Sequence, residues 1–152
     1  MSVQIVEFED SHAAAFKALN EAWIGKHFTL EAKDSEILDD PKGKIIAEGG
    51  RVFMAMAGAT PVGCVALIPM ADGGLEVAKM TVSEEARGMF LGQALMERCI
   101  EAGRAAGAPR LYLETNSSLG PARALYLAAG FKDLPPAPTP YARCDRWMEL
   151  RL

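Results

Sequence analysis

Three strand-like runs follow one another in the middle of the chain, and only short turns separate them. The runs are Arg51–Ala57, Val62–Ala71 and Leu75–Val82, with glycine or proline in the turns between them. Strands joined by turns of a few residues must run antiparallel, because a parallel pair needs a crossover of a dozen or more residues. The sequence therefore predicts an antiparallel meander at the centre of the fold.

The stretches on either side of the meander show helical or strand-like periods. In chain order we expect a strand at Gln4–Phe8, a helix with His12, Phe16, Leu19 and Trp23 on one face, a short helix from Asp39-Asp40-Pro41 to Gly49-Gly50, a helix at Leu91–Ala106, a strand at Arg110–Thr115, a helix at Pro121–Ala129, and strands at Phe131–Leu134 and Asp145–Leu152. No linker or repeat interrupts this order. We therefore expect one α/β domain over residues 1–152, with a mixed sheet flanked by helices.

Composition narrows the classes of protein to which the chain can belong. Its 152 residues carry a net charge of −4, which argues against a nucleic-acid or membrane-surface partner, because such proteins are usually basic. No apolar run approaches the roughly 20 residues of a membrane span, and the acidic start does not resemble a signal peptide. Cys64, Cys99 and Cys144 are too widely spaced for a metal cluster or a disulfide framework. We expect a cytoplasmic enzyme or binding domain without a metal.

The segment Leu75–Met96 is the most informative about chemistry. It reads as a strand, a loop containing Gly88, and a helix that starts near Gly92. Loop amides and the positive end of a helix together can hold a phosphate group. The segment contains neither a P-loop nor the glycine fingerprint of dinucleotide-binding folds. An ordinary strand–helix connection is the alternative to a phosphate site.

Two motifs in the second half of the chain resemble the GNAT superfamily of N-acetyltransferases. The run VAKMTVSEEARGMFLGQALM resembles the acyl-CoA loop of that superfamily, Q/R-x-x-G-x-G/A, with Arg87 at its first position and Gly92 at its second glycine. The run LYLETNSSLGPARALYLAAGF resembles the strand and helix that follow in the superfamily; the matching residues are Ala122, Leu125, Tyr126, Gly130 and Phe131. WIGKHF, LDDP and ETNSSL further resemble bacterial acetyltransferase domains, some of which are fused to a helix-turn-helix regulator.

Two positions depart from the superfamily pattern. Phe90 stands where the first loop glycine is usual, and a side chain fits there if φ stays negative. Leu119 stands where asparagine is frequent, and Asn116 is close enough in sequence to replace it.

The resemblance implies where the cofactor binds. Acetyl-CoA would lie in a splayed gap between the strands Leu75–Val82 and Arg110–Thr115 of a mostly antiparallel sheet. Backbone groups of the first strand would pair with the pantetheine arm, as an added strand does, and loop amides would hold the pyrophosphate. The implied cofactor-binding residues are Met80, Thr81, Val82, Arg87, Gly88, Met89, Phe90, Leu91, Gly92, Gln93 and Asn116.

The resemblance also implies two catalytic residues. Tyr126 is the candidate acid that protonates the departing thiolate, the alternative being a tyrosine that only packs its ring. Glu76 is the candidate base; strand alternation puts it on one face with Ala78, Met80 and Val82, and the alternative is a solvated carboxylate.

The two histidines need no catalytic role. His12 lies on the apolar side of its helix, where packing explains it, and His27 lies in the loop after Trp23, where it could border the acceptor site.

These observations lead to one functional expectation and two alternatives. We expect direct transfer of an acetyl group from acetyl-CoA to a primary amine of a small molecule or a protein, with a homodimer left open. The acidic region 1–48, with ten acids against five bases, favours a cationic acceptor. The alternatives are a non-catalytic module that senses acyl-CoA and an enzyme that transfers a different acyl group.

Overall fold

A computed structural model describes residues 2–88 and 90–152 of the chain. The strands in this part are β1 Gln4–Glu7, β2 Arg51–Ala57, β3 Thr60–Pro69, β4 Leu75–Val82, β5 Arg110–Thr115, β6 Lys132–Leu134 and β7 Arg146–Arg151. The helices are α1 Ala13–His27, α2 Ala32–Leu38, α3 Leu91–Ala105 and α4 Gly120–Ala129, with the 3-10 turns η1 Asp10–His12 and η3 Glu84–Ala86 and the π-helical turn η2 Lys42–Ile46.

The strands form one mixed sheet in the order β1-β2-β3-β4-β5-β7-β6. All neighbours are antiparallel except β4 and β5, which are parallel. The predicted meander is confirmed as β2, β3 and β4, and the strands that pair around it complete the predicted α/β architecture.

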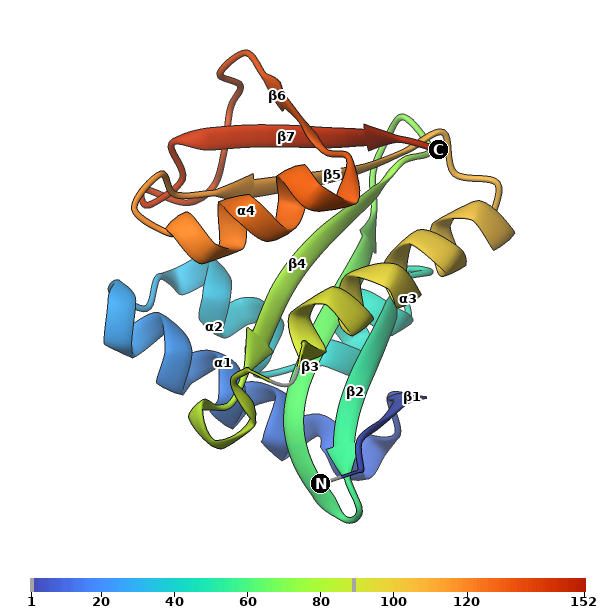
Figure 1. Cartoon of the computed structure of the whole chain (residues 1–152), viewed down its shortest axis with the longest axis vertical. Helices are drawn as coiled ribbons and strands as arrows, with labels where there is room; N and C mark the ends of the chain where they lie inside the picture. Colours follow the sequence, from blue (N-terminus) through green and yellow to red (C-terminus); the bar gives the residue numbers. More distant parts are fainter. Residues whose placement is uncertain (1, 89) are drawn as a thin grey trace.

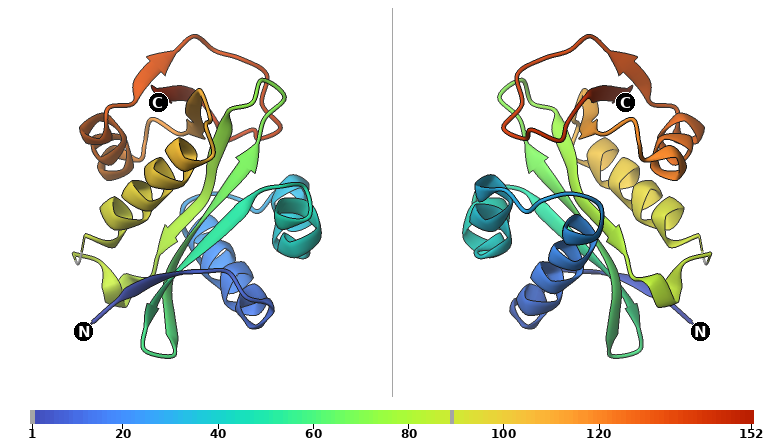
Figure 2. Two further views of the ribbon diagram at one scale, coloured as in Figure 1. Left: turned by 90° about the vertical axis from the view of Figure 1, so that its right-hand side faces the viewer. Right: turned by 90° about the vertical axis from the view of Figure 1, so that its left-hand side faces the viewer.

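Helices cover both faces of the sheet. α1 and α2 lie on one face, here called the α1 face, and α3 and α4 lie on the other, the α3 face (Figures 1 and 2). Strand alternation supplies a core to each face: Phe53 and Ala55 of β2 belong to the core of the α3 face, whereas Val52 and Met54 belong to that of the α1 face. The β2–β3 part of the sheet is therefore buried on both sides.

The helices before the meander differ in part from the sequence prediction. α2 was not predicted, because its seven residues lie in a charged segment that resembles a loop. A capping box between Glu31 and Asp34 starts this helix, and Ile37 and Leu38 anchor it in the core. The short helix predicted after Pro41 is the π-helical turn η2. None of the helices in the described part is long and apolar enough to cross a membrane.

β4 contains one residue more than the segment of β3 opposite it. The register pairs Cys64 with Thr81 and Ala66 with Ala78, so the strand bulges between these two rungs. Lys79 lies in the bulge and has φ 56°, in the left-handed region. A bulge of this kind shifts all later side chains of the strand to the opposite face.

The bulge overturns part of the predicted face pattern. Glu76 and Ala78 are on the α1 face, because Glu76 pairs with Ile68 and that residue packs there. Met80 and Val82 pack instead against the core of the α3 face. The prediction that Glu76 shares a face with Met80 and Val82 is therefore wrong, because simple alternation assumes a strand without bulges.

Candidate active site

The gap between β4 and β5 is the centre of the candidate site. The two strands pair only through Leu75 with Leu111 and Glu76 with Tyr112, and then they diverge (Figure 1). Beyond Glu76, β4 therefore presents to the gap an edge that β5 does not pair. An unpaired strand edge of this kind can hydrogen-bond to an extended ligand.

The positive end of α3 lies where this free edge ends. α3 begins at Leu91, and its N-cap residue Phe90 offers no side-chain hydrogen bond to the first turn. Among the residues that the structure describes, the first bond within the helix runs from the Ala94 amide to the Phe90 carbonyl, at 3.1 Å. The amides of Leu91 and Gly92 lie in the first turn of the helix, where backbone amides can bind an anion. Met89, which the sequence analysis also assigns to this site, lies outside the described residues.

Two glycines shape this end of α3. Gly88 has φ 81°, a conformation that a residue with a Cβ rarely adopts. A Cβ on Gly92 would lie 3.4 Å from the Leu125 Cδ2 atom of α4. Gly92 therefore lets α3 and α4 approach each other beside the gap.

Phe90 does not adopt the conformation expected for a side chain at that position. Its φ is 57° and its ψ 27°, so it takes the left-handed conformation typical of glycine. Its side chain is 78% exposed and contributes nothing to the core. Phe90 thus keeps the backbone geometry of the glycine that is usual at this position, and the strain costs about 1–2 kcal/mol of folding free energy.

A groove of about 440 Å³ lies between α1 and the end of β4. Thr81, Val82 and Arg87 line it from the β4 side, and Trp23 and Lys26 line it from α1. Three residues of the predicted cofactor set therefore border one hollow.

His27 is the last residue of α1 and not part of a loop, and its ring lies 5.0 Å from that of Trp23.

Tyr126 lies on α4, on the α3 face of the sheet. Its half-buried ring packs against the core there and lies 6.1 Å from the ring of Phe131, centroid to centroid. Burial raises the pKa of Tyr126 to about 12. Its hydroxyl carries a proton at neutral pH, as it would at the ordinary tyrosine pKa of about 10, so it can serve as a donor.

Glu76 lies on the opposite face, at the point where the two strands part. Burial, and next the charge of Glu114, raise the pKa of Glu76 to about 7, although Lys79 and Lys33 oppose the shift. A carboxylate with a pKa near neutrality can accept a proton at the pH at which enzymes work.

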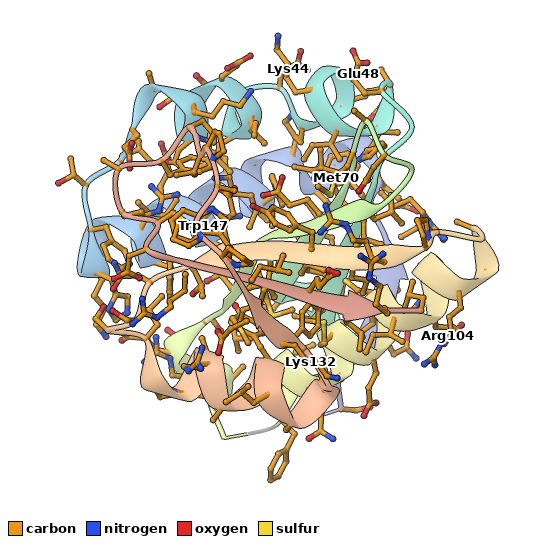
Figure 3. All side chains as sticks on the ribbon, turned by 90° about the horizontal axis from the view of Figure 1, so that it is seen from above. Lys44, Glu48, Met70, Arg104, Lys132 and Trp147 are labelled. Carbon is orange, nitrogen blue, oxygen red and sulfur yellow. The ribbon has the colours of Figure 1, made fainter. Side chains whose placement is uncertain are left out.

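Glu76 lines a pocket of about 480 Å³ on the α1 face. Its polar lining residues are Glu76, Arg110, Tyr112 and Glu114, and its apolar ones are Met70, Leu134, Pro135, Ala137 and Pro138. Figure 3 looks down on this end of the molecule, where Met70 follows β3. The pocket thus combines two carboxylates with an apolar wall.

Glu114 is the second carboxylate of this pocket. It accepts hydrogen bonds from the Tyr112 hydroxyl at 2.8 Å and from the Thr139 hydroxyl at 2.6 Å. Sequence reasoning missed its role, although its place two residues after Tyr112 on the same strand indicates that both point to one face.

Asn116 has a structural task in addition to its predicted contact with the cofactor. Its amide nitrogen donates to the Arg143 carbonyl at 2.7 Å, and its side-chain oxygen accepts from the Ser118 amide at 2.8 Å. The first bond joins the end of β5 to the segment before β7, and the second stabilises the turn that follows β5. The contact of Asn116 with CoA stays a prediction.

Comparison with known proteins identifies the class. A model of the acetyltransferase (GNAT) family matches residues 12–131. The chain therefore belongs to this family, whose members are acyl-CoA-dependent N-acetyltransferases, and the resemblance noted in the sequence is confirmed.

Individual relatives agree with this family. An IAA acetyltransferase of Azospirillum brasilense is 40% identical over 87 residues, which are 57% of each chain, so the match spans little more than half of that protein. The structure of a GNAT acetyltransferase of Staphylococcus aureus has a TM-score of 0.89 at 18% identity and covers 99% of both chains. That of the PaiA N-acetyltransferase of Thermoplasma acidophilum in complex with coenzyme A has a TM-score of 0.80 at 16% identity over the whole of both chains. The two structures confirm the fold.

Proposed function

We propose that this chain transfers an acetyl group from acetyl-CoA to a primary amine by direct attack of the amine on the thioester. The observation that carries the proposal is the free edge of β4 beside the uncapped start of α3. An extended arm with a diphosphate at one end suits this arrangement, because the edge pairs with amide groups and the helix start attracts the phosphates.

The residues around the gap fit coenzyme A. The edge from Met80 to Val82 would pair with the pantetheine arm, and the amides from Gly88 and from Phe90 to Gln93 would hold the pyrophosphate. Arg87 is exposed and adds a positive charge beside this anion site. A protein of the same fold has been solved in complex with coenzyme A, which supports coenzyme A as the ligand.

The acceptor would arrive on the α1 face. The amine nitrogen must be neutral to attack, so its proton passes to the Glu76 carboxylate, directly or through a water. The new C–N bond forms as the C–S bond breaks, and the thiolate takes a proton from the Tyr126 hydroxyl. The amide nitrogen then gives up its second proton to water, and water returns a proton to Tyr126. Base and acid thus stand on opposite faces of the sheet, which suits a reaction in which the two proton transfers occur on different atoms.

The pocket beside Glu76 favours a cationic acceptor with an apolar body. Its two carboxylates attract a positive charge, because the Arg110 guanidinium that also lines the pocket is paired with Asp72 at 3.0 Å and Glu149 at 3.7 Å. Proline, leucine and methionine line the apolar wall. The acidic region 1–48 adds less than its composition indicates, because several of its acids are in ion pairs; these include Glu7 with Arg51, Asp10 with Lys42 and Asp39 with Lys17. We therefore assign acceptor selection to Glu76 and Glu114 more than to long-range attraction.

A screen of amines with acetyl-CoA tests the proposal. Free thiol is measured with each amine and without any amine, and the acetylated amine is identified by mass spectrometry. Amine-dependent thiol release supports the enzyme. Coenzyme A binding by calorimetry with no amine-dependent release across the screen would indicate the acyl-CoA sensor instead.

A further inference from the structure

Three separate elements of the fold meet at the side chain of Asp34. This carboxylate on α2 is fully buried. It accepts a hydrogen bond from Lys79 Nζ at 2.5 Å, and Arg143 grips it with both terminal nitrogens, at 2.7 Å to Oδ2 and 2.6 Å to Oδ1. Burial alone would raise the pKa of Asp34, but the bonds from Arg143 and Lys79 bring it to about 2. Asp34 is therefore charged at any working pH and joins α2 to two cations.

Each cation comes from a part of the chain that borders the candidate site. Lys79 is the left-handed residue of the β4 bulge, and its side chain is 4% exposed. Arg143 belongs to the segment 135–145, which connects β6 to β7 and carries part of the apolar wall of the pocket. The ion cluster thus links the bulge that ends at the free edge of β4 with the wall that faces Glu76.

The cluster is also balanced in charge. Glu31 accepts from Arg143 at 3.3 Å and from the Ala142 amide at 3.0 Å, so two carboxylates face two cations. A buried ion cluster adds little to stability compared with an apolar core of the same shape, but loss of one member leaves an uncompensated charge. The main effect of the cluster is therefore to fix the relative positions of α2, β4 and the segment 135–145, and its contribution to the free energy of unfolding is small.

Tyr141 shows what the cluster holds in place. Its hydroxyl accepts a hydrogen bond from Lys79 Nζ at 3.1 Å. Lys79 Nζ and Arg143 Cζ also lie 4.6 and 4.5 Å from the centroid of its ring, in cation–π contacts. The Tyr141 amide donates to the Thr139 hydroxyl at 3.2 Å, and that hydroxyl donates to Glu114. The segment is therefore fixed at Arg143 by Asp34 and at Thr139 by Glu114.

We propose that Asp34 is a positioning residue for the acceptor: through Lys79 and Arg143 it holds the segment 135–145 opposite Glu76, so that the amine site is formed before the amine binds. The inference rests on the proposed acetyl transfer. Asp34 itself touches neither the thioester nor the amine. Its loss should weaken capture of the amine and leave the phosphate-binding part of the coenzyme A site, at the start of α3, unchanged.

The test compares steady-state kinetics of four variants with the wild-type protein and the best amine of the screen. Asp34→Asn removes the charge that the cations share. Arg143→Gln removes the side-chain bonds of the segment to Asp34 and Glu31 and leaves Asp34 paired with Lys79, so it serves even if Asp34→Asn does not fold. Arg143→Lys keeps the charge without the two-pronged grip.

Arg123→Gln is the matched control. Arg123 on α4 grips Asp133 on β6 with two bonds, at 2.8 and 2.7 Å, so this variant also loses a two-pronged pair next to the β6–β7 connection. It leaves the cluster around Asp34 intact. This pair is more exposed than that of Arg143 with Asp34, so the variant shows the effect of losing a two-pronged arginine pair next to the connection, while Arg143→Lys controls for the buried charge.

We expect the KM for the amine to rise about tenfold or more in Asp34→Asn and Arg143→Gln, as a displaced positioning group allows. Arg143→Lys should recover part of the loss, and the KM for acetyl-CoA should stay within about twofold throughout. An amine KM equal to that of Arg123→Gln, or an equal rise of both KM values, would overturn the positioning role. A wild-type protein that acetylates no amine would instead overturn the proposed function, so the two failures are distinct.

Discussion

Glu76 of β4 stands directly opposite Tyr112 of β5, in the last rung that joins these two strands. Glu76 thus belongs both to the paired part of the sheet and to the gap between β4 and β5. Its backbone closes the paired part of the sheet, and its carboxylate lies in the pocket on the α1 face. This placement limits access of water to the carboxylate and explains the altered acidity on which the following pH prediction depends.

Tyr126→Phe should lower turnover and leave binding unchanged. The substitution keeps the ring and its contact with Phe131 but removes the hydroxyl proton. We expect kcat to fall by about a hundredfold or more, which is the usual effect of losing a general acid. Turnover at saturating acetyl-CoA, with melting temperature and coenzyme A affinity as controls, measures this. Unchanged turnover would show that water protonates the thiolate, and a parallel loss of affinity would assign Tyr126 to cofactor positioning.

The activity should depend on the ionisation of Glu76. A base must be deprotonated, so kcat/KM should rise with pH through about 7, the pKa of this carboxyl. Glu114→Gln removes the neighbouring negative charge, and the acid limb of the profile should then move to lower pH. The groups that face Glu76 are Glu114 on β5, Lys79 on β4 and Lys33 on α2, with Arg110, Tyr112 and Tyr141 around them.

Glu76→Gln is the control for this profile. It should abolish the limb near pH 7 together with most of the activity. A limb that persists in Glu76→Gln at the same pH would mean that another group titrates. A limb that does not move in Glu114→Gln would contradict the stated cause of the shift.

The same carboxyl makes stability depend on pH. Its pKa is about 7 in the folded chain and about 4.3 in an unfolded one, so the folded state binds more protons between these values. The contribution of Glu76 to stability is therefore fully present below about pH 4.3 and is lost as the pH rises through 7. Denaturant unfolding of wild type and Glu76→Gln at pH 5 and pH 8 checks this. Relative to wild type, Glu76→Gln should gain stability at pH 8; a gain that is equal at both pH values would contradict the shift.

The loop before α3 should tolerate glycine at position 90 but not proline. Phe90→Gly keeps the left-handed conformation without strain, and the exposed ring leaves no cavity. Phe90→Pro fixes φ near −65° and must change the loop. We expect calorimetry to give wild-type or tighter coenzyme A binding for the first variant and at least tenfold weaker binding for the second. Equal affinity of both variants would show that this backbone geometry does not matter for the cofactor.

Local signals in the sequence were sufficient for much of the fold. The strands Arg51–Ala57 and Leu75–Val82 have the predicted bounds, because turns at glycine and proline delimit them. α3 starts at the predicted Leu91 and ends one residue early. Such features depend on neighbours in the chain and can be predicted from spacing.

Other features depend on contacts that spacing does not encode. Lys79 in the bulge has a left-handed backbone conformation although it is not a glycine, so the sequence does not indicate the bulge. Its side chain forms a buried pair with Asp34. The bond from Arg143 to Asp34 joins residues 109 positions apart, and no local pattern indicates it. The motif resemblance led to Tyr126 and Glu76, whereas the acceptor wall and Glu114 became visible only in three dimensions.

Gly92→Glu offers a direct test of the phosphate site. A side chain at this position meets Leu125, and its negative charge lies at the start of α3, where the pyrophosphate is assigned. Calorimetry should detect no coenzyme A binding to this variant, while Gly25→Glu on α1, where a side chain would meet nothing within 4 Å, should bind as wild type does. For the wild-type protein, pantetheine should bind more weakly than coenzyme A; equal affinity would contradict a phosphate cradle.

The most direct measurement of the central claim is the stoichiometry of the reaction itself. Wild-type protein is incubated with acetyl-CoA and the best amine of the screen, and free thiol and N-acetylated amine are quantified over the same time course, against a control without amine. We predict that both products appear at equal rates, one thiol for each acetylated amine, and that Tyr126→Phe slows both together. Tight coenzyme A binding with thiol release no faster than in the control without amine would contradict catalysis and leave a binding module.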